Sequence, residues 1–190
     1  MKLDIMQVGM LETNCYIVSD DEKNALVIDP GANARGIIEF LEENALQCEY
    51  ILLTHGHRDH TGALVRLKEA TGAKVVAHSG DVAKLPVAPD ILVVGGDVIK
   101  CGALEFSVIE TPGHTPGGIC FLCGDSLFSG DTLFCDSVGR TDLDGGSFEI
   151  LRHSLSTLCD LPFADLTVYP GHMQRTTLAH ERACNPFIER

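Results

Sequence analysis

The 190-residue chain is poor in basic residues and has no long apolar run. Only 14 Lys and Arg accompany 27 Asp and Glu, which gives a formal net charge of −13 at pH 7. Because nucleic-acid binding depends on basic surface, this balance argues against a nucleic-acid partner. No stretch approaches the ~18 uncharged apolar residues that a membrane span needs, so we expect no membrane partner either.

The first residues lack the apolar core of a secretory signal, and Asp4 places an acid among them. We therefore expect a cytoplasmic protein. The eight cysteines agree, because they are scattered through apparent core segments and a chain of this size needs no disulfide framework. Cys120 and Cys123 form a Cys-x-x-Cys pair, but they lie in a predicted strand that ends in a turn. That position favours core packing over redox chemistry.

Length and an apolar content of 45% predict one compact domain over residues 1–190. Sequence patterns predict helices over residues 33–46, 59–71, 148–158 and 176–184. The helix over 148–158 is expected to bury Phe148, Leu151, Leu155 and Leu158. The first thirty residues are predicted to form strands, among them 15–18 and 25–28. Short β-prone runs predict further strands over residues 50–53, 74–77, 98–100, 104–109, 118–123, 126–130 and 166–169. This mixture of strand–helix units and hairpins indicates an α+β fold of two packed sheets with helices outside.

The most informative stretch is Thr54-His55-Gly56-His57-Arg58-Asp59-His60, which holds four potential metal ligands within six residues. His55 and His57 are two apart in an extended segment, so their side chains can project to the same side. Asp59 and His60 follow at the first turn of a predicted helix, where Asp59 also suits the N-cap. Nothing about a strand–helix turn requires three imidazoles, so the run predicts a metal site.

Three further residues, His114, Asp131 and His172, each follow an apolar run at a glycine-containing turn. Ligands at strand ends are how a rigid sheet presents side chains along one rim. Five histidines and two aspartates are too many for one zinc and suit a two-metal centre that shares one carboxylate. The remaining histidines lie in predicted helical or loop surroundings and are expected to be structural or surface residues: His78, His153 and His180.

These motifs resemble the metallo-β-lactamase-fold hydrolases, and among them the short, single-domain proteins of the glyoxalase II (hydroxyacylglutathione hydrolase) type. The resemblance covers nearly the whole chain, and the segments that carry it are 54–60, 111–117, 130–134, 139–142, 169–172 and 176–187. It implies an αββα sandwich with the site on one rim of the two sheets. It also implies a first metal on His55, His57 and His114, a second on Asp59, His60 and His172, and Asp131 as the bridge.

The resemblance further implies the roles of the carboxylates and of one arginine. Asp59 and Asp131 belong to the catalytic centre as ligands first, because a metal-bound carboxylate is a poor base. Arg140 is a candidate contact for an anionic group of the substrate. Asp131 separates this group from several antibiotic-hydrolysing members, which lack the bridging carboxylate.

The sequence departs from full glyoxalase II enzymes in three places. Only 18 residues follow His172, so the helical region that helps those enzymes hold glutathione has no counterpart in this sequence. The usual Gly-His-Gly-Pro is Gly171-His172-Met173-Gln174, and His180 stands where a tyrosine or another residue is expected. Cys135, four residues after Asp131, is expected near the pocket without a catalytic role.

The expected reaction is hydrolysis of a small-molecule thioester such as S-lactoylglutathione by a hydroxide held between two divalent metal ions. Zinc is the first choice of metal, and His/Asp sites also accept iron and manganese. A thioester suits this site because a thiol with a pKa of about 8.5 leaves as thiolate without a general acid. The oligomeric state is left open by the sequence.

Two other interpretations are weighed against the hydrolase. Persulfide dioxygenases of the same fold resemble the chain too, and would use a single iron on His55, His114 and Asp131. A non-enzymatic zinc-binding protein would use four ligands, usually with cysteine, and leave no water position. Seven nitrogen and oxygen ligands without cysteine favour the hydrolase over both.

Overall fold

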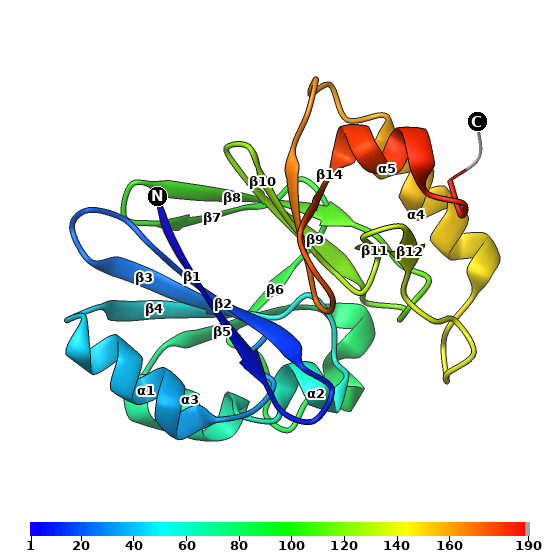
Figure 1. Cartoon of the computed structure of the whole chain (residues 1–190). Coiled ribbons are helices and arrows are strands. Elements are labelled where there is room, and N and C mark those ends of the chain that lie inside the picture. Colours follow the sequence, from blue (N-terminus) through cyan, green and yellow to red (C-terminus); the bar gives the residue numbers. More distant parts are fainter. Residues whose placement is uncertain (189–190) are drawn as a thin grey trace.

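Two six-stranded sheets pack against each other in the computed structural model, which describes residues 1–188 (Figure 1). Helices cover the outer face of each sheet, so the predicted α+β sandwich is confirmed. Each sheet buries apolar residues on both faces, because one face meets the other sheet and the other face meets helices.

The first sheet contains the N-terminal half of the chain in the order β1-β2-β3-β4-β5-β6. Its strands are β1 (Lys2–Val8), β2 (Thr13–Ser19), β3 (Asn24–Ile28), β4 (Gln47–Leu52), β5 (Lys74–His78) and β6 (Ile91–Val93). Strands β1 to β3 pair antiparallel, whereas β3 to β6 pair parallel through crossovers. The intervening helices are α1 (Ala34–Glu43), α2 (Arg58–Thr61), α3 (Leu64–Thr71) and the 3₁₀ helix η1 (Ser79–Lys84).

The second sheet has the order β14-β13-β10-β9-β8-β7. Its strands are β7 (Val98–Cys101), β8 (Leu104–Glu110), β9 (Ile119–Cys123), β10 (Ser126–Gly130), β13 (Thr167–Pro170) and β14 (Thr176–Thr177). Strands β11 (Leu133–Phe134) and β12 (Ser137–Val138) form a separate small hairpin. Helices α4 (Phe148–Cys159) and α5 (Leu178–Cys184) lie on the far side of this sheet (Figure 1).

The core between the sheets is aliphatic and aromatic. Leu26 and Ile28 from the first sheet share one buried cluster with Phe106, Phe121 and Phe128 from the second. Cys120 and Cys123 lie in β9 as buried free thiols, as their strand position predicted. Within residues 1–188, none of the helices is long and apolar enough to cross a lipid bilayer.

The structure corrects the helix predicted over residues 59–71, which is two helices. The amide of Ala63 donates to the carbonyl of Pro30, at 2.9 Å, instead of continuing the helix. A Cβ on Gly62 would lie only 2.3 Å from the carbonyl oxygen of Gly31, so the turn packs directly against the loop after β3. The N-cap residue of α2 is His57, and Asp59 therefore lies inside the helix instead of capping it.

Three smaller expectations also need correction. Phe148 is 44% exposed, because it starts α4 at the edge of the sheet, whereas Leu151, Leu155 and Leu158 are buried as predicted. His78 ends strand β5 and does not lie in a helix or loop. The helix predicted over 176–184 begins only at Leu178, because Thr176–Thr177 form strand β14. This strand and three others of two or three residues, β6, β11 and β12, were not predicted.

Candidate metal centre

The seven side chains predicted as ligands meet at one rim of the sandwich, between the ends of both sheets. Four of them lie in the segment from β4 into α2: His55, His57, Asp59 and His60. The other three follow β8, β10 and β13, at His114, Asp131 and His172. Residues more than 100 positions apart in the sequence thus become neighbours.

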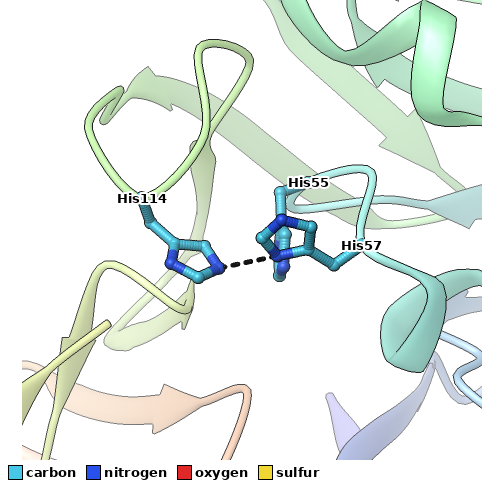
Figure 2. A group of neighbouring side chains, drawn as sticks. All are labelled: His55, His57 and His114. Atoms are coloured by element: carbon cyan, nitrogen blue, oxygen red, sulfur yellow. Dashed lines mark hydrogen bonds between the residues drawn. The ribbon is translucent and has the colours of Figure 1, made fainter. Parts of the chain in front are cut away.

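His55, His57 and His114 form the first group. Their ligand atoms lie within 4.8 Å of one another, and the rings come from two loops that face each other (Figure 2). His57 Nδ1 lies 2.9 Å from His114 Nε2, the contact drawn as a dashed line in Figure 2. Three imidazoles that converge in this way match the geometry of a tridentate nitrogen site.

Asp59, His60 and His172 form the second group, and their ligand atoms also lie within 4.8 Å of one another. His172 Nε2 is 3.2 Å from Asp59 Oδ2, and His60 Nε2 is 3.6 Å from the same oxygen. The two imidazole nitrogens of His60 and His172 face each other at 3.3 Å. One carboxylate and two imidazoles therefore surround a second position.

The carboxylate of Asp131 reaches both groups. Its Oδ2 lies 3.4 Å from Nε2 of His114 in the first group and 3.6 Å from Nε2 of His172 in the second. Its Oδ1 lies 3.3 Å from His60 Nε2. This placement is the one that a carboxylate shared by two cations requires.

The outer ring nitrogen of four histidines is engaged by the surrounding protein. His60 Nδ1 contacts Asp29 Oδ2 at 2.9 Å, His114 Nδ1 the carbonyl of Arg140 at 2.6 Å, and His172 Nδ1 the carbonyl of Leu11 at 3.0 Å. His55 Nδ1 lies 3.1 Å from Thr54 Oγ1. Such outer contacts fix the ring orientation and leave Nε2 for a metal.

The polar atoms at the centre lack the partners that buried groups normally have. His55 Nε2 and Asp131 Oδ1 are buried and form no hydrogen bond within the described chain. Leaving a buried polar atom unsatisfied costs about 1–3 kcal/mol, so two of them at one point indicate a missing positive partner. All seven donors are imidazole or carboxylate, a set that suits zinc, iron or manganese. The residues present therefore fit divalent cations.

The electrostatic surroundings point the same way. Burial, together with the neighbouring imidazoles, lowers the pKa of His55 well below its ordinary value, so this ring is neutral and can donate its lone pair. The pKa of Asp59 is lowered to about 2, because the hydrogen bond from His172 and the charge of His60 outweigh burial. The pKa of His60 is raised despite burial, because Asp131 and Asp29 favour positive charge there. A proton or a metal cation can supply that charge.

Two buried aspartates that hold the ligand loops, Asp29 and Asp81, were not predicted from the sequence. Asp29 accepts from the amide and hydroxyl of Thr54, at 2.8 and 2.6 Å, as well as contacting His60. Asp81, 1% exposed in η1, accepts from the amides of Gly56 at 2.8 Å and Gly117 at 3.1 Å. Asp29 follows a strand directly, the same signal that identified Asp131, whereas no local pattern marks Asp81.

Gly171 shows how closely the backbone approaches the centre. A Cβ at this position would lie 2.3 Å from Asp131 Oδ1 and 2.6 Å from His60 Cε1. The amide of Gly171 donates to the carbonyl of Gly130 at 2.8 Å, which ties the loop after β13 to the loop that carries Asp131. Only glycine leaves room for the central carboxylate here.

The remaining predicted site residues lie around this centre. The backbone of Arg140 orients His114, while its guanidinium forms a two-pronged pair with Asp142 at 2.7 and 2.8 Å. Cys135 is half-buried and accepts from Gln174 Nε2 at 3.4 Å, which joins two loops beside the site. His180 is exposed and contacts Asp136 at 2.8 Å, away from the seven-residue cluster.

A cavity of about 560 Å³ opens onto the centre. Its floor contains His57, Asp59, His114, Asp131 and His172. The walls are largely apolar. They are formed by Leu11, Phe134, Val138, Leu143 and Met173, together with three polar residues, Arg58, Ser137 and Arg140. The cavity is large enough for a small organic substrate.

Comparison with curated proteins finds relatives that align over nearly the whole of both chains. The hydroxyacylglutathione hydrolase GloC of Haemophilus influenzae is 34% identical over 209 aligned positions, which cover 99% of this chain and 98% of that protein.

Solved structures are similar over nearly the whole chain as well. The BLEG-1 B3 metallo-beta-lactamase superposes with a TM-score of 0.91 at 32% identity, covering 100% of both chains. ETHE1 from Myxococcus xanthus has a TM-score of 0.89 at 33% identity, covering 98% of this chain and 84% of that one. TTHA1623 in a di-iron-bound form has a TM-score of 0.88 at 34% identity, covering 97% and 100%.

The family comparison agrees with the fold and with the His/Asp cluster at its rim. Residues 8–172, which include all seven predicted ligands, match the metallo-beta-lactamase superfamily. The chain therefore belongs to the metallo-beta-lactamase superfamily of metallo-hydrolases.

Proposed function

We propose that this protein hydrolyses small-molecule thioesters, such as S-lactoylglutathione, with two divalent cations held by the seven-residue cluster. The observation that carries the proposal is the sharing of Asp131 between two groups of ligand atoms. His55, His57 and His114 would hold one cation, and Asp59, His60 and His172 the other. A single structural metal would use only four of these side chains.

Two similar proteins support the thioester substrate and the pair of cations in this proposal. The GloC relative is named as a hydroxyacylglutathione hydrolase, which supports a thioester substrate. The TTHA1623 structure holds two irons, which supports a pair of cations in a chain of this fold. Zinc is the metal we expect first, and iron and manganese are the alternatives that imidazole and carboxylate donors also accept.

A bound divalent cation lowers the pKa of water and polarises an acyl carbonyl. The chain's own contribution is to hold Asp59 and Asp131 ionised and the imidazoles oriented, through Asp29, Thr54 and the carbonyl groups described above. Apart from the proposed ligands, no Asp, Glu or His among residues 1–188 lines the cavity. A leaving group that needs no proton therefore suits the site, and a thiolate is such a group.

Metal content and thioesterase activity, measured together, test the proposal. Purified protein should contain about two equivalents of metal and hydrolyse S-lactoylglutathione. His57→Ala should lose both metal and activity, whereas His153→Ala on the exposed face of α4 should lose neither. Normal hydrolysis by metal-free protein would contradict the proposal.

The second candidate is a persulfide dioxygenase, and the similarity to ETHE1 supports it. His55, His114 and Asp131 would then hold one iron as a two-histidine, one-carboxylate face. One equivalent of iron and oxygen uptake with glutathione persulfide would identify this activity. Two equivalents of metal without oxygen uptake would exclude it.

A further inference from the structure

Arg58 lies between His57 and Asp59 in the motif, and its side chain lines both the candidate site cavity and the hollows beside it. It lines the cavity of about 560 Å³ over the metal centre and also two adjoining hollows of about 330 and 520 Å³. The first hollow shares Leu11, Arg58 and Asp59 with the cavity. The second shares Gly31 and Arg58 with the first. The three hollows therefore adjoin one another along the surface, and this row of hollows, here named the groove, begins at the proposed metal centre and ends beside α1 and α3.

The far end of this groove is basic in a strongly acidic protein. Arg35, Arg58 and Arg66 line it together, although the whole chain has only 14 Lys and Arg and a net charge of −13. No Asp or Glu among residues 1–188 lines this hollow. Three guanidinium groups around one hollow without a lining carboxylate form a local site for an anion.

Two of these arginines have no acidic partner among residues 1–188. The side chains of Arg58 and Arg66 are exposed and take part in none of the ion pairs or hydrogen bonds of the described chain. Arg35 pairs with Glu39 at 2.6 Å, one helical turn along α1. Arg140, which also lines the cavity, is already paired with Asp142 through two nitrogens of its guanidinium. Arg58 and Arg66 therefore each present an unpaired guanidinium near the centre, in addition to Lys84, whose charge acts on His57 and whose Nζ donates to the carbonyl of Asp144 at 3.2 Å.

The middle hollow of the groove is lined by uncharged residues apart from Arg58 and Asp59. Gly9, Met10 and Leu11 of the β1–β2 turn line it, together with Val8 and Thr13 at the ends of the two strands. Met10 is fully exposed and Leu11 is 64% exposed. An apolar passage between a cation centre and a basic end suits an uncharged linker. Guanidinium forks bind carboxylate and phosphate oxygens in pairs, which suits an anionic end group.

We propose that the groove binds the thiol half of the substrate, with its anionic distal end, a phosphate or a carboxylate, at Arg58 and Arg66. This inference rests on the proposed thioesterase function and adds the substrate class to it. The acyl carbonyl would lie at the metal centre, an uncharged linker along the β1–β2 turn, and the charged end in the hollow between α1, α2 and α3. Phosphate and carboxylate share this chemistry, and the experiment separates them.

The test compares thioesters that carry one acyl group on three thiols: N-acetylcysteamine, which is neutral, glutathione, which carries carboxylates, and pantetheine 4′-phosphate. For the wild type, kcat/KM should be higher for one or both charged thioesters than for the neutral one. In Arg66→Ala the ratio of charged to neutral kcat/KM should fall about tenfold, mainly through KM, as expected for one lost charge-assisted contact. A fall in this ratio for the glutathione thioester indicates a carboxylate at the site, and a fall for the pantetheine 4′-phosphate thioester indicates a phosphate. Lys100→Ala, which removes an exposed charge from β7, should keep the wild-type ratio.

Arg58→Lys and Arg58→Ala complete the set, with metal content measured in each because Arg58 neighbours proposed ligands. Arg58→Lys should keep part of the wild-type ratio of charged to neutral kcat/KM, because lysine retains the positive charge but cannot bind two anion oxygens at once as a guanidinium does. Binding of the free thiols, pantetheine 4′-phosphate against pantetheine, is measured by calorimetry as a readout independent of hydrolysis. If the phosphorylated thiol binds in an Arg66-dependent way but no thioester is hydrolysed, the anion site in the groove is supported and the proposed thioesterase function is rejected. If both wild type and Arg66→Ala hydrolyse the thioesters with the same ratio of charged to neutral kcat/KM, the groove does not bind the anionic end of the thiol.

Discussion

The two sheets contribute to the candidate metal centre in different ways. The N-terminal sheet supplies four of the seven side chains from one continuous segment, residues 55–60. The C-terminal sheet supplies single residues from three separate loops, at His114, Asp131 and His172. The first contribution is a local motif that can be recognised in the sequence, and the second depends on how β8, β10 and β13 are ordered in the sheet.

Neither of the two proposed ligand groups is complete within one sheet. His55 and His57 need His114 from the other sheet, and Asp59 and His60 need His172. The backbone repeats this pattern, because the amide of Ile119 donates to Thr54 at 2.9 Å and the amide of Asn14 donates to Gly171 at 2.8 Å. The centre is thus an interface between the sheets, and the following changes test each connection across it.

Asp131→Ala should have the largest effect, because this carboxylate from the second sheet reaches both ligand groups. We expect less than one equivalent of metal and a loss of thioesterase activity of more than about a hundredfold, since even residues outside the ligand set contribute 10–100-fold. His172→Ala, which touches only one group, should keep about one equivalent. Metal analysis of both variants checks the ranking, and two equivalents in Asp131→Ala would contradict the shared role.

Asp81→Asn should have the next largest effect, because one carboxylate holds the His55–His57 loop and the His114 loop together. The asparagine side chain can still accept one of the two backbone hydrogen bonds through its carbonyl oxygen. Its NH₂ group then faces the other backbone N–H, and two donors cannot pair. We expect a free energy of unfolding lower by about 1–3 kcal/mol and metal affinity lower by about 10–100-fold. Urea unfolding and metal titration measure these. Asp144→Asn, at an exposed loop position, is the matched control, and equal behaviour of the two variants would show that the cross-link is unimportant.

Asp20→Asn tests the contact between the sheets at the other end of β2 and should have the smallest effect. Asp20 accepts from the side chain of Asn24 at 2.8 Å and from the amide of Ala103, in the turn of the second sheet, at 3.0 Å. These bonds lower the pKa of Asp20 in the folded state. The stabilisation is therefore present above the unfolded pKa of about 3.9 and is lost as the pH falls through the folded value.

The urea midpoint of wild type and Asp20→Asn, measured at pH 7 and pH 3, checks this sign. The difference between the two proteins should be larger at pH 7 and should shrink at pH 3. A difference that grows towards low pH would mean that the Asp20 carboxylate is not stabilised by folding.

The outcome of the sequence predictions follows the same division between local and distant contacts. The helix over 148–158 and the β9 strand depend on local periodicity and were predicted nearly to their ends. The break between α2 and α3 was missed because its cause, the Pro30 carbonyl that accepts from Ala63, lies 33 residues away along the chain. Phe148 was expected inside because periodicity identifies a helix face but not where the sheet beneath it ends.

The same limit applies around the candidate centre. The run from His55 to His60 can be found because several chemically matched residues lie side by side, and glycine-flanked strand ends pointed to His114, Asp131 and His172. Asp81 could not be found, because a single aspartate in a short 3₁₀ helix differs from a surface residue only by its burial and its two amide partners. The groove past Arg58 likewise has no sequence signature.

By itself the sequence determined the chemical character of this protein: nitrogen and oxygen donors concentrated in one run, no cysteine among them, and strand ends that carry the rest. Those properties are set by residue type and local spacing, so they survive without coordinates. Only the tertiary structure decided that Asp131 lies between two groups, that Asp81 joins two loops and that three arginines line one groove. Such arrangements come from the packing of two sheets, and packing brings together residues whose positions along the chain are unrelated.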